Sequence, residues 1–313
     1  MEKKWKKLLS GEIGLLMILI ILCVVFAFAS PYFLKQQNLL NITRQVSIVL
    51  IVAMGMLGVV LVGEIDLSVG SSAAVAGVAC AYALQKTEST FAGILAALAV
   101  GALIGLLNGS LVVYGKIPSF IVTLATMGIL RGAAMVWTNG KPVSNLPSEF
   151  SVFGSGYVFG MIPMATIISI ALMLLFYVFL QKTKHGVYIK AIGANSEAAV
   201  LSTIPLAKYK LLVFLFSGAM AAIGGVISTS KLLSAQPTAS SGLEMDVLSG
   251  VILGGASLSG GVGTVIGAFI GTLIIGVINN GLNLLNVSSY WQQIVKGIII
   301  VAAVLIKKGE KNK

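Results

Sequence analysis

The stretch QVSIVLIVAMGMLGVVLVGEIDLSVGSSAAVAGVACAYAL, residues 45–84, decides the fold. It contains two apolar runs, 45–63 and 67–84, and each is long enough to cross the hydrocarbon core of a bilayer as a helix. Between them stand two carboxylates, Glu64 and Asp66, which are costly at membrane depth and mark a functional path or a helix end that faces water. The stretch therefore predicts two consecutive transmembrane helices joined by a short polar turn.

The whole chain shares the composition of this stretch. Of its 313 residues, 57% are hydrophobic and 10% are charged, and the mean hydropathy is +1.01. A soluble globular protein carries about 25% charged residues, because its surface must meet water. The 36 glycines fit helices in a membrane better than helices in water. The composition excludes a soluble enzyme and a nucleic-acid-binding protein, and it predicts an integral protein of the lipid bilayer.

Short polar breaks divide the chain into about ten apolar runs, so the predicted fold is an all-α polytopic membrane protein. The eighth run is too short to cross as a straight helix, and it is expected to be broken or re-entrant. The predicted spans are 13–30, 45–63, 67–84, 91–114, 118–137, 161–180, 211–230, 246–257, 263–284 and 290–306. The chain 1–313 is predicted to be a single transmembrane domain, with 181–210 as a cytoplasmic loop within it.

The basic residues predict the orientation. The net charge of +11 comes from 21 basic and 10 acidic residues. With both termini in the cytoplasm, fourteen basic residues lie inside and five outside, as the positive-inside rule requires. Arg131 and Lys296 fall in the outer halves of spans, where they are expected to snorkel outward or to line the external mouth. The first run resembles a secretory signal, but its length favours an uncleaved helix.

A weak internal repeat relates spans 2–5 to spans 7–10. On the predicted topology the two matching motifs lie on opposite sides of the membrane. Such an inverted repeat places a translocation path between two halves of a transporter. The matching residues are Glu64, Asp66 and Gly70 in one half and Glu244, Asp246 and Gly250 in the other, 180 positions later.

The acidic residues of this repeat have two possible roles. Asp66 or Ser68 is expected to cap the third helix, and Glu244 and Asp246 are expected to do the same at the start of the eighth span. Coupling of transport to ions or protons through these carboxylates is the alternative role. Helix capping is the preferred interpretation.

A glycine-rich motif spans residues 253–264. Its small residues, Gly254 and Gly255 among them, permit tight turns and close helix packing. No Gly-Lys-Ser/Thr follows, and no soluble strand–helix unit surrounds it, so it is not a nucleotide-binding loop. The two cysteines lie in apolar runs and His185 is the sole histidine, so no metal site is expected.

A third motif lies in the basic loop 181–210. Asn195 or Ser196 is expected to cap a short amphipathic helix that Pro205 follows closely. Such a helix offers a docking site for a partner subunit, or it lies on the anionic lipid surface. The residues of interest are Gly193, Asn195, Glu197, Ala198 and Ala199.

Together these motifs resemble the permease subunits of ATP-binding-cassette (ABC) sugar importers, in particular the ribose-type branch. The resemblance covers nearly the whole chain, from the first span to Ile306. It rests on residues 65–70, 118–124, 253–261 and 279–290. Two positions depart from the family pattern, because Glu64 stands where a glycine is frequent and Val262 where a basic residue is common.

The resemblance implies a channel-forming subunit of a bacterial cell membrane that hydrolyses nothing itself. Two copies would line a central path, and an extracytoplasmic binding protein would deliver the sugar. A cytoplasmic ATPase, which holds the ATP and magnesium, would grip the loop around Glu197. This chain would therefore carry no cofactor and would not be an enzyme.

For the path we nominate Asn108, Asn280 and Asn283, because their amides can exchange hydrogen bonds with sugar hydroxyls. Hydrogen bonding between helices is the competing role for each of them. The cargo is expected to be ribose, with another sugar or a furanosyl signal molecule as the alternative. An ion-coupled secondary transporter is a further alternative, and a membrane enzyme is a remote one because the acidic residues do not converge.

Overall fold

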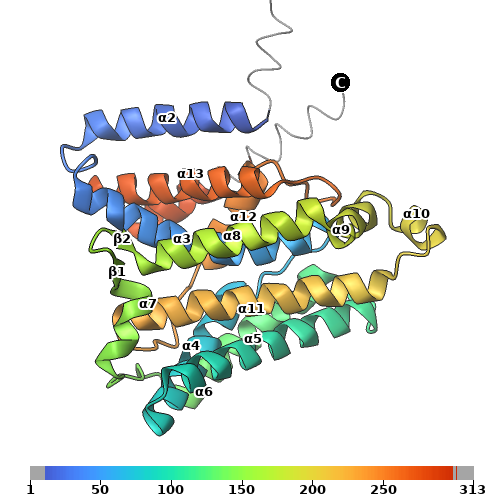
Figure 1. Cartoon of the computed structure of the whole chain (residues 1–313), viewed down its shortest axis with the longest axis horizontal. Helices are drawn as coiled ribbons and strands as arrows, with labels where there is room; N and C mark the ends of the chain where they lie inside the picture. Colours follow the sequence, from blue (N-terminus) through green and yellow to red (C-terminus); the bar gives the residue numbers. More distant parts are fainter. Residues whose placement is uncertain (1–10, 299–300, 302–313) are drawn as a thin grey trace, which may run out of the picture.

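The computed structural model describes residues 11–298 and 301, and long helices make up most of this part. Figure 1 shows them lying side by side in one bundle, with α2 at one edge and α5 and α6 at the other. The helices are α2 (Glu12–Ala29), α3 (Gln36–Leu61), α4 (Val69–Thr87), α5 (Thr90–Val113), α6 (Ser119–Thr138), α8 (Met164–Lys182), α9 (Lys184–Ala194), α10 (Ser196–Leu201), α11 (Leu206–Leu232), α12 (Leu243–Leu253) and α13 (Val265–Leu284).

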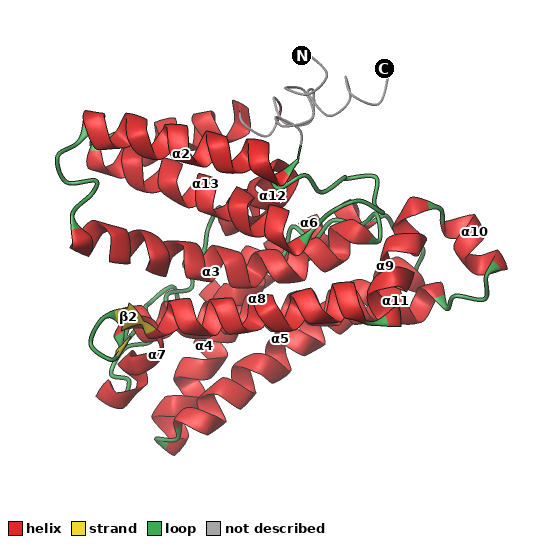
Figure 2. Cartoon of the chain, turned by 45° about the horizontal axis from the view of Figure 1, so that its top comes forward, coloured by secondary structure: helices red, strands yellow, loops and turns green. Residues whose placement is uncertain are grey.

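Short elements cover one end of the bundle between α6 and α8. A 3-10 turn, η1 (Ser148–Ser151), and a one-turn helix, α7 (Val152–Ser155), are followed by the strands β1 (Tyr157–Val158) and β2 (Ile162–Pro163). The strands pair antiparallel, with Tyr157 opposite Pro163. We call this end the α7 end, and the opposite end, where α9 and α10 lie, the α10 end (Figure 2).

Seven of the described helices are long and apolar enough to cross a membrane, namely α2, α3, α5, α6, α8, α11 and α13. They correspond to seven of the ten predicted spans. The expected span 67–84 is α4, a 19-residue helix with serines in its first turn and Gln85 and Lys86 in its last. The expected span 246–257 overlaps the 11-residue α12, which begins three residues earlier. The expected span 290–306 lies partly outside the described residues, and its part 290–298 is helical. A multi-pass helical protein is thus confirmed, whereas the count of ten is not.

The starts of α3 and α11 differ most from the predicted spans. Helix α3 begins at Gln36 rather than at 45, and α11 begins at Leu206 rather than at 211. Polar residues in these first turns lower the hydropathy without interrupting the helical hydrogen bonds. Helix α8 begins at Met164 rather than at 161, because the preceding residues form the strand β2.

Helices α3 and α11 form the centre of the bundle. Helix α11 packs on α3, α4 and α5, while α3 packs on α8, α11, α12 and α13. Leu50, Met54 and Leu57 of α3 have essentially no exposed surface. Small residues allow the closest approaches: Gly101 and Gly105 of α5 lie directly against Gly218 and Phe214 of α11, with backbone touching backbone.

A side chain at Gly105 should therefore separate α5 from α11. We expect Gly105→Leu to lower the thermal stability of the purified protein, because its Cβ would overlap the carbonyl oxygen of Phe214. Forced overpacking of this kind costs about 1–3 kcal/mol. The matched control is Gly128→Leu on α6, where an added Cβ meets nothing within 4 Å. Equal melting temperatures for the two variants in detergent would contradict this packing.

Candidate translocation and coupling sites

A buried carboxylate organises the turn between α3 and α4. Asp66 is 2% exposed. Its Oδ1 accepts hydrogen bonds from the Ser68 amide at 3.0 Å and the Ser68 hydroxyl at 2.6 Å, and its Oδ2 accepts one from Ser217 of α11 at 2.8 Å.

The capping prediction at this turn was wrong, because neither Asp66 nor Ser68 accepts a hydrogen bond from an amide of α4. Ser68 is the residue that precedes α4, but its hydroxyl accepts no amide of that helix. The carboxylate of Asp66 instead receives the Ser68 amide just before the helix begins. The turn is also held by α6, because the Ser119 hydroxyl accepts from the Ile65 amide at 3.2 Å.

Asn108 extends this network across three helices. Its Nδ2 donates to the Ser68 hydroxyl at 2.9 Å, and its Oδ1 accepts from the Thr126 hydroxyl of α6 at 2.8 Å. The side chain has no exposed surface. In this conformation Asn108 therefore joins helices, and its nomination as a path residue stays a prediction.

Glu64, two residues before Asp66, forms an ion pair with Lys210 of α11. The pair borders a hollow of about 480 Å³ at the α10 end, which Lys116 and Pro118 also line. Sequence reasoning missed this partner, because 146 positions separate the two residues and charge alone does not select one lysine among many.

The predicted docking helix is present as α10. The Asn195 Oδ1 accepts from the Ala198 amide at 3.0 Å, which confirms Asn195 as the capping residue. Ala199 is buried beneath the helix, whereas Glu197 and Leu201 are exposed, Leu201 to 86%. Figure 2 shows α10 projecting beyond the ends of the long helices, where a partner could reach it.

Glycines connect this segment to the membrane helices. Gly193 at the end of α9 lies against the Leu61 carbonyl oxygen and the Gly261 amide. The Gly261 amide in turn donates to Leu61 at 2.9 Å. The predicted tight turns are confirmed, because Gly255 has φ +91° and Gly254 packs against the backbone of Gly267. The end of α9, which precedes α10, thus packs directly against the end of α3 and the loop before α13.

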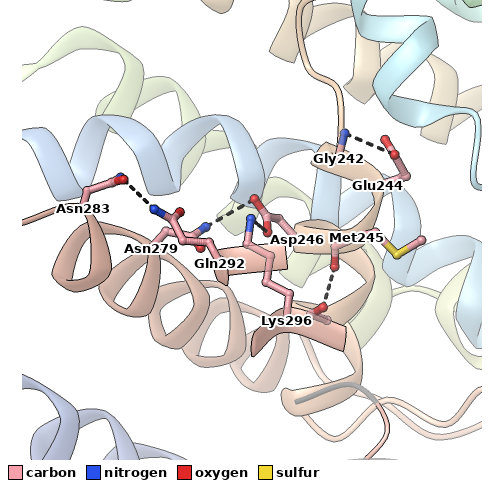
Figure 3. Close-up of polar contacts among 9 residues, drawn as sticks. Gly242, Glu244, Met245, Asp246, Asn279, Asn283, Gln292 and Lys296 are labelled. Atoms are coloured by element: carbon pink, nitrogen blue, oxygen red, sulfur yellow. Dashed lines mark hydrogen bonds and ion pairs between the residues drawn. The ribbon is translucent and has the colours of Figure 1, made fainter. Parts of the chain in front are cut away.

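A second polar cluster lies around α12 (Figure 3). The Lys296 Nζ lies 2.7 Å from the Asp246 Oδ1, and the Asn279 Nδ2 donates to the Asp246 Oδ2 at 3.3 Å. Both charged side chains are largely buried, at 17% and 15% exposure. One expectation was therefore wrong, because Asp246 does not cap α12. Lys296 pairs with Asp246 rather than snorkelling outward, and its alternative place at the external mouth stays a prediction. Glu244 does serve the helix start, since its Oε1 accepts from the Gly242 amide at 3.2 Å.

The other two nominated asparagines also bond between helices. Asn280 and Asn38 form a reciprocal amide pair with distances of 2.8 and 3.0 Å, and both are buried. The Asn283 Oδ1 accepts from the Gln292 Nε2 at 2.8 Å (Figure 3). Their part in translocation stays a prediction.

Arg131 has a different role from the one expected. Its Nη1 donates to the carbonyl oxygens of Pro237 and Ala239 at 2.7 and 2.8 Å. The guanidinium therefore holds the non-helical segment between α11 and α12 rather than pointing toward the membrane surface. Among the described residues, no group of three or more His, Cys, Asp or Glu side chains could hold a metal ion.

Breaking the pair in Figure 3 should destabilise the fold. We expect Lys296→Met to lower the melting temperature markedly, because it leaves the buried Asp246 charge without its cation, a change that costs about 3–5 kcal/mol. The double variant Asp246→Asn, Lys296→Met should recover much of the loss. A double variant no more stable than Lys296→Met alone would contradict the pairing.

Fold and sites together define a polytopic helical membrane protein of the transporter class, with a small helix presented at one end. A family model described as "Branched-chain amino acid transport system / permease component" matches residues 38–304. Because this match covers most of the chain, the protein belongs to that permease family.

Similar proteins carry more specific names. The ribose import permease of Haemophilus influenzae is 44% identical over 291 residues, 92% of this chain and 90% of the relative. That of Bacillus subtilis is 42% identical over 95% of this chain and 92% of the relative. The L-arabinose transport system permease of Escherichia coli is 38% identical over 95% and 90%. No solved structure matches the chain.

Proposed function

We propose that this chain is the membrane-spanning subunit of an ABC importer and that it moves ribose into the bacterial cytoplasm. One observation carries the proposal: the similarity to ribose import permeases at 42–44% identity extends over more than nine-tenths of the chain. The arabinose permease is less similar, at 38%. Another pentose is accordingly the second candidate cargo.

A separate cytoplasmic ATPase would supply the energy, with ATP and magnesium bound on that partner. The exposed helix α10 and its glycine contacts to α3 support this division of labour, since they connect a docking surface to the transmembrane helices. Gly193, Asn195, Glu197, Ala198 and Ala199 form this coupling segment. An extracytoplasmic binding protein would deliver the sugar at the α7 end.

The proposal includes ten membrane-inserted segments with both termini in the cytoplasm, and an inverted repeat. Packing supports the repeat, because α11 lies on α4 and α5 just as α3 lies on α12 and α13. The polar contacts correspond too. Asn108 reaches Ser68 beside Asp66, and Asn279 reaches Asp246. The first helix of each proposed half, α3 or α11, thus packs against the other half. This arrangement suits alternating access between two copies of the chain.

Reconstitution tests the proposed function. The chain, its ATPase and its binding protein, assembled in proteoliposomes, should accumulate labelled ribose only with ATP and magnesium. Arabinose serves as the competing sugar. Uptake by the isolated chain under a sodium or proton gradient would instead support a secondary transporter and overturn the proposal.

The docking helix provides a sharper test. We expect Leu201→Asp to reduce co-purification of the ATPase and sugar-stimulated ATP hydrolysis at least tenfold, because it places a charge on the most exposed apolar position of α10. The matched control for co-purification of the ATPase is Phe159→Asp, a 91% exposed apolar residue at the opposite, α7 end. Normal ATPase recovery with Leu201→Asp would show that α10 is not the docking surface.

A further inference from the structure

The connection between α11 and α12, residues 233–242, runs back into the bundle without forming a helix. Figure 1 shows this connecting segment, in orange, running from the end of α11 toward α12. Ala235 packs with Val78 and Ala81 in the middle of α4. Five residues later, the Ser240 carbonyl oxygen lies against Gly70 in the first turn of α4, next to Glu244. The segment therefore descends alongside α4.

The depth of this segment follows from helix geometry. The eleven residues from Ala81 back to Gly70 correspond to about 16 Å of helix at 1.5 Å per residue. Helix α4 runs beside α5, because Leu84 touches Gly93 and Ser68, just before α4, bonds to Asn108, five residues before α5 ends. The segment thus crosses about half of a hydrocarbon core that is about 30 Å thick.

Non-helical backbone exposed to lipid is strongly unfavourable at this depth, because lipid offers no hydrogen-bond partner to the amide and carbonyl groups. Non-helical chain is tolerated there only inside protein or beside water. Arg131, in the middle of α6, satisfies the Pro237 and Ala239 carbonyls, and Glu244 satisfies the Gly242 amide. Arg131 and Glu244 thus hold this short segment in one conformation.

The side chains of the segment give the second observation. Gln236, Thr238 and Ser241 are all exposed, whereas Ala235 and Pro237 are buried. Exposed amides and hydroxyls at membrane depth are unfavourable against lipid and favourable against water. The exposed surfaces of α5 and α8 differ, because leucine, isoleucine and valine dominate them.

We propose that Gln236, Thr238 and Ser241 line the water-filled path through which the sugar passes, and that Arg131 positions them. The inference rests on the proposed function and assigns the surface of its path. Neutral amides and hydroxyls exchange hydrogen bonds with sugar hydroxyls. They do not form the stronger charge-assisted hydrogen bonds that would retain the sugar. Such a surface suits passage, while the asparagines nominated from sequence hold the helices together.

Cysteine labelling tests the inference. In the assembled complex, with Cys23 and Cys80 replaced by alanine, we expect Gln236→Cys, Thr238→Cys and Ser241→Cys to react with a membrane-impermeant charged methanethiosulfonate. The matched control is Val178→Cys on α8, a 53% exposed position on an apolar surface. It should react at least tenfold more slowly. A modified Thr238→Cys should also lose most ATP-driven ribose uptake.

The outcomes separate this inference from the proposed function. If the parent complex imports ribose but the three cysteines react no faster than Val178→Cys, lipid or a second protein surface covers the segment and the inference fails alone. Rapid labelling that leaves uptake unchanged also overturns it. If the parent complex imports no ribose, the proposed function fails, whereas labelling still reports whether the segment faces water.

Discussion

The need to satisfy every backbone polar group inside a bilayer governs this structure. Long helices satisfy their own groups, so seven apolar helices form most of the bundle. Two exceptions are the junctions where the chain leaves helical conformation near Asp66 and before α12. At each junction, polar side chains from distant parts of the sequence supply the missing partners.

These junctions explain why the few charges of the chain lie where they do. Asp66 receives hydroxyl and amide donors from α4 and α11, while Arg131 and Glu244 bind the backbone ahead of α12. Lys210 and Lys296 neutralise Glu64 and Asp246. Two of these contacts, from Ser217 and Lys210, join α11 to the turn between α3 and α4.

Small residues make the close contacts between the segment that carries α10 and the membrane helices. Gly193, Gly260 and Gly261 bring the end of α9 against the end of α3, with no side chain between the backbones. Backbones packed this closely transmit movement directly, because they deform less than a long flexible side chain between them would. Helix α10 is consequently both the most projecting element and one that is rigidly connected to the membrane helices.

The membrane class, most spans, the capped helix at Asn195 and the glycine turns follow from the amino-acid sequence, because hydropathy, capping and turn chemistry are local properties. Hydropathy misplaced the starts of α3 and α11, where polar first turns hide a continuing helix. Tertiary structure alone decided the partners of Glu64, Asp246 and Arg131 and the interhelical role of Asn108, Asn280 and Asn283. Those contacts join residues up to 242 positions apart, and only the packing of the helices brings such side chains within hydrogen-bonding distance.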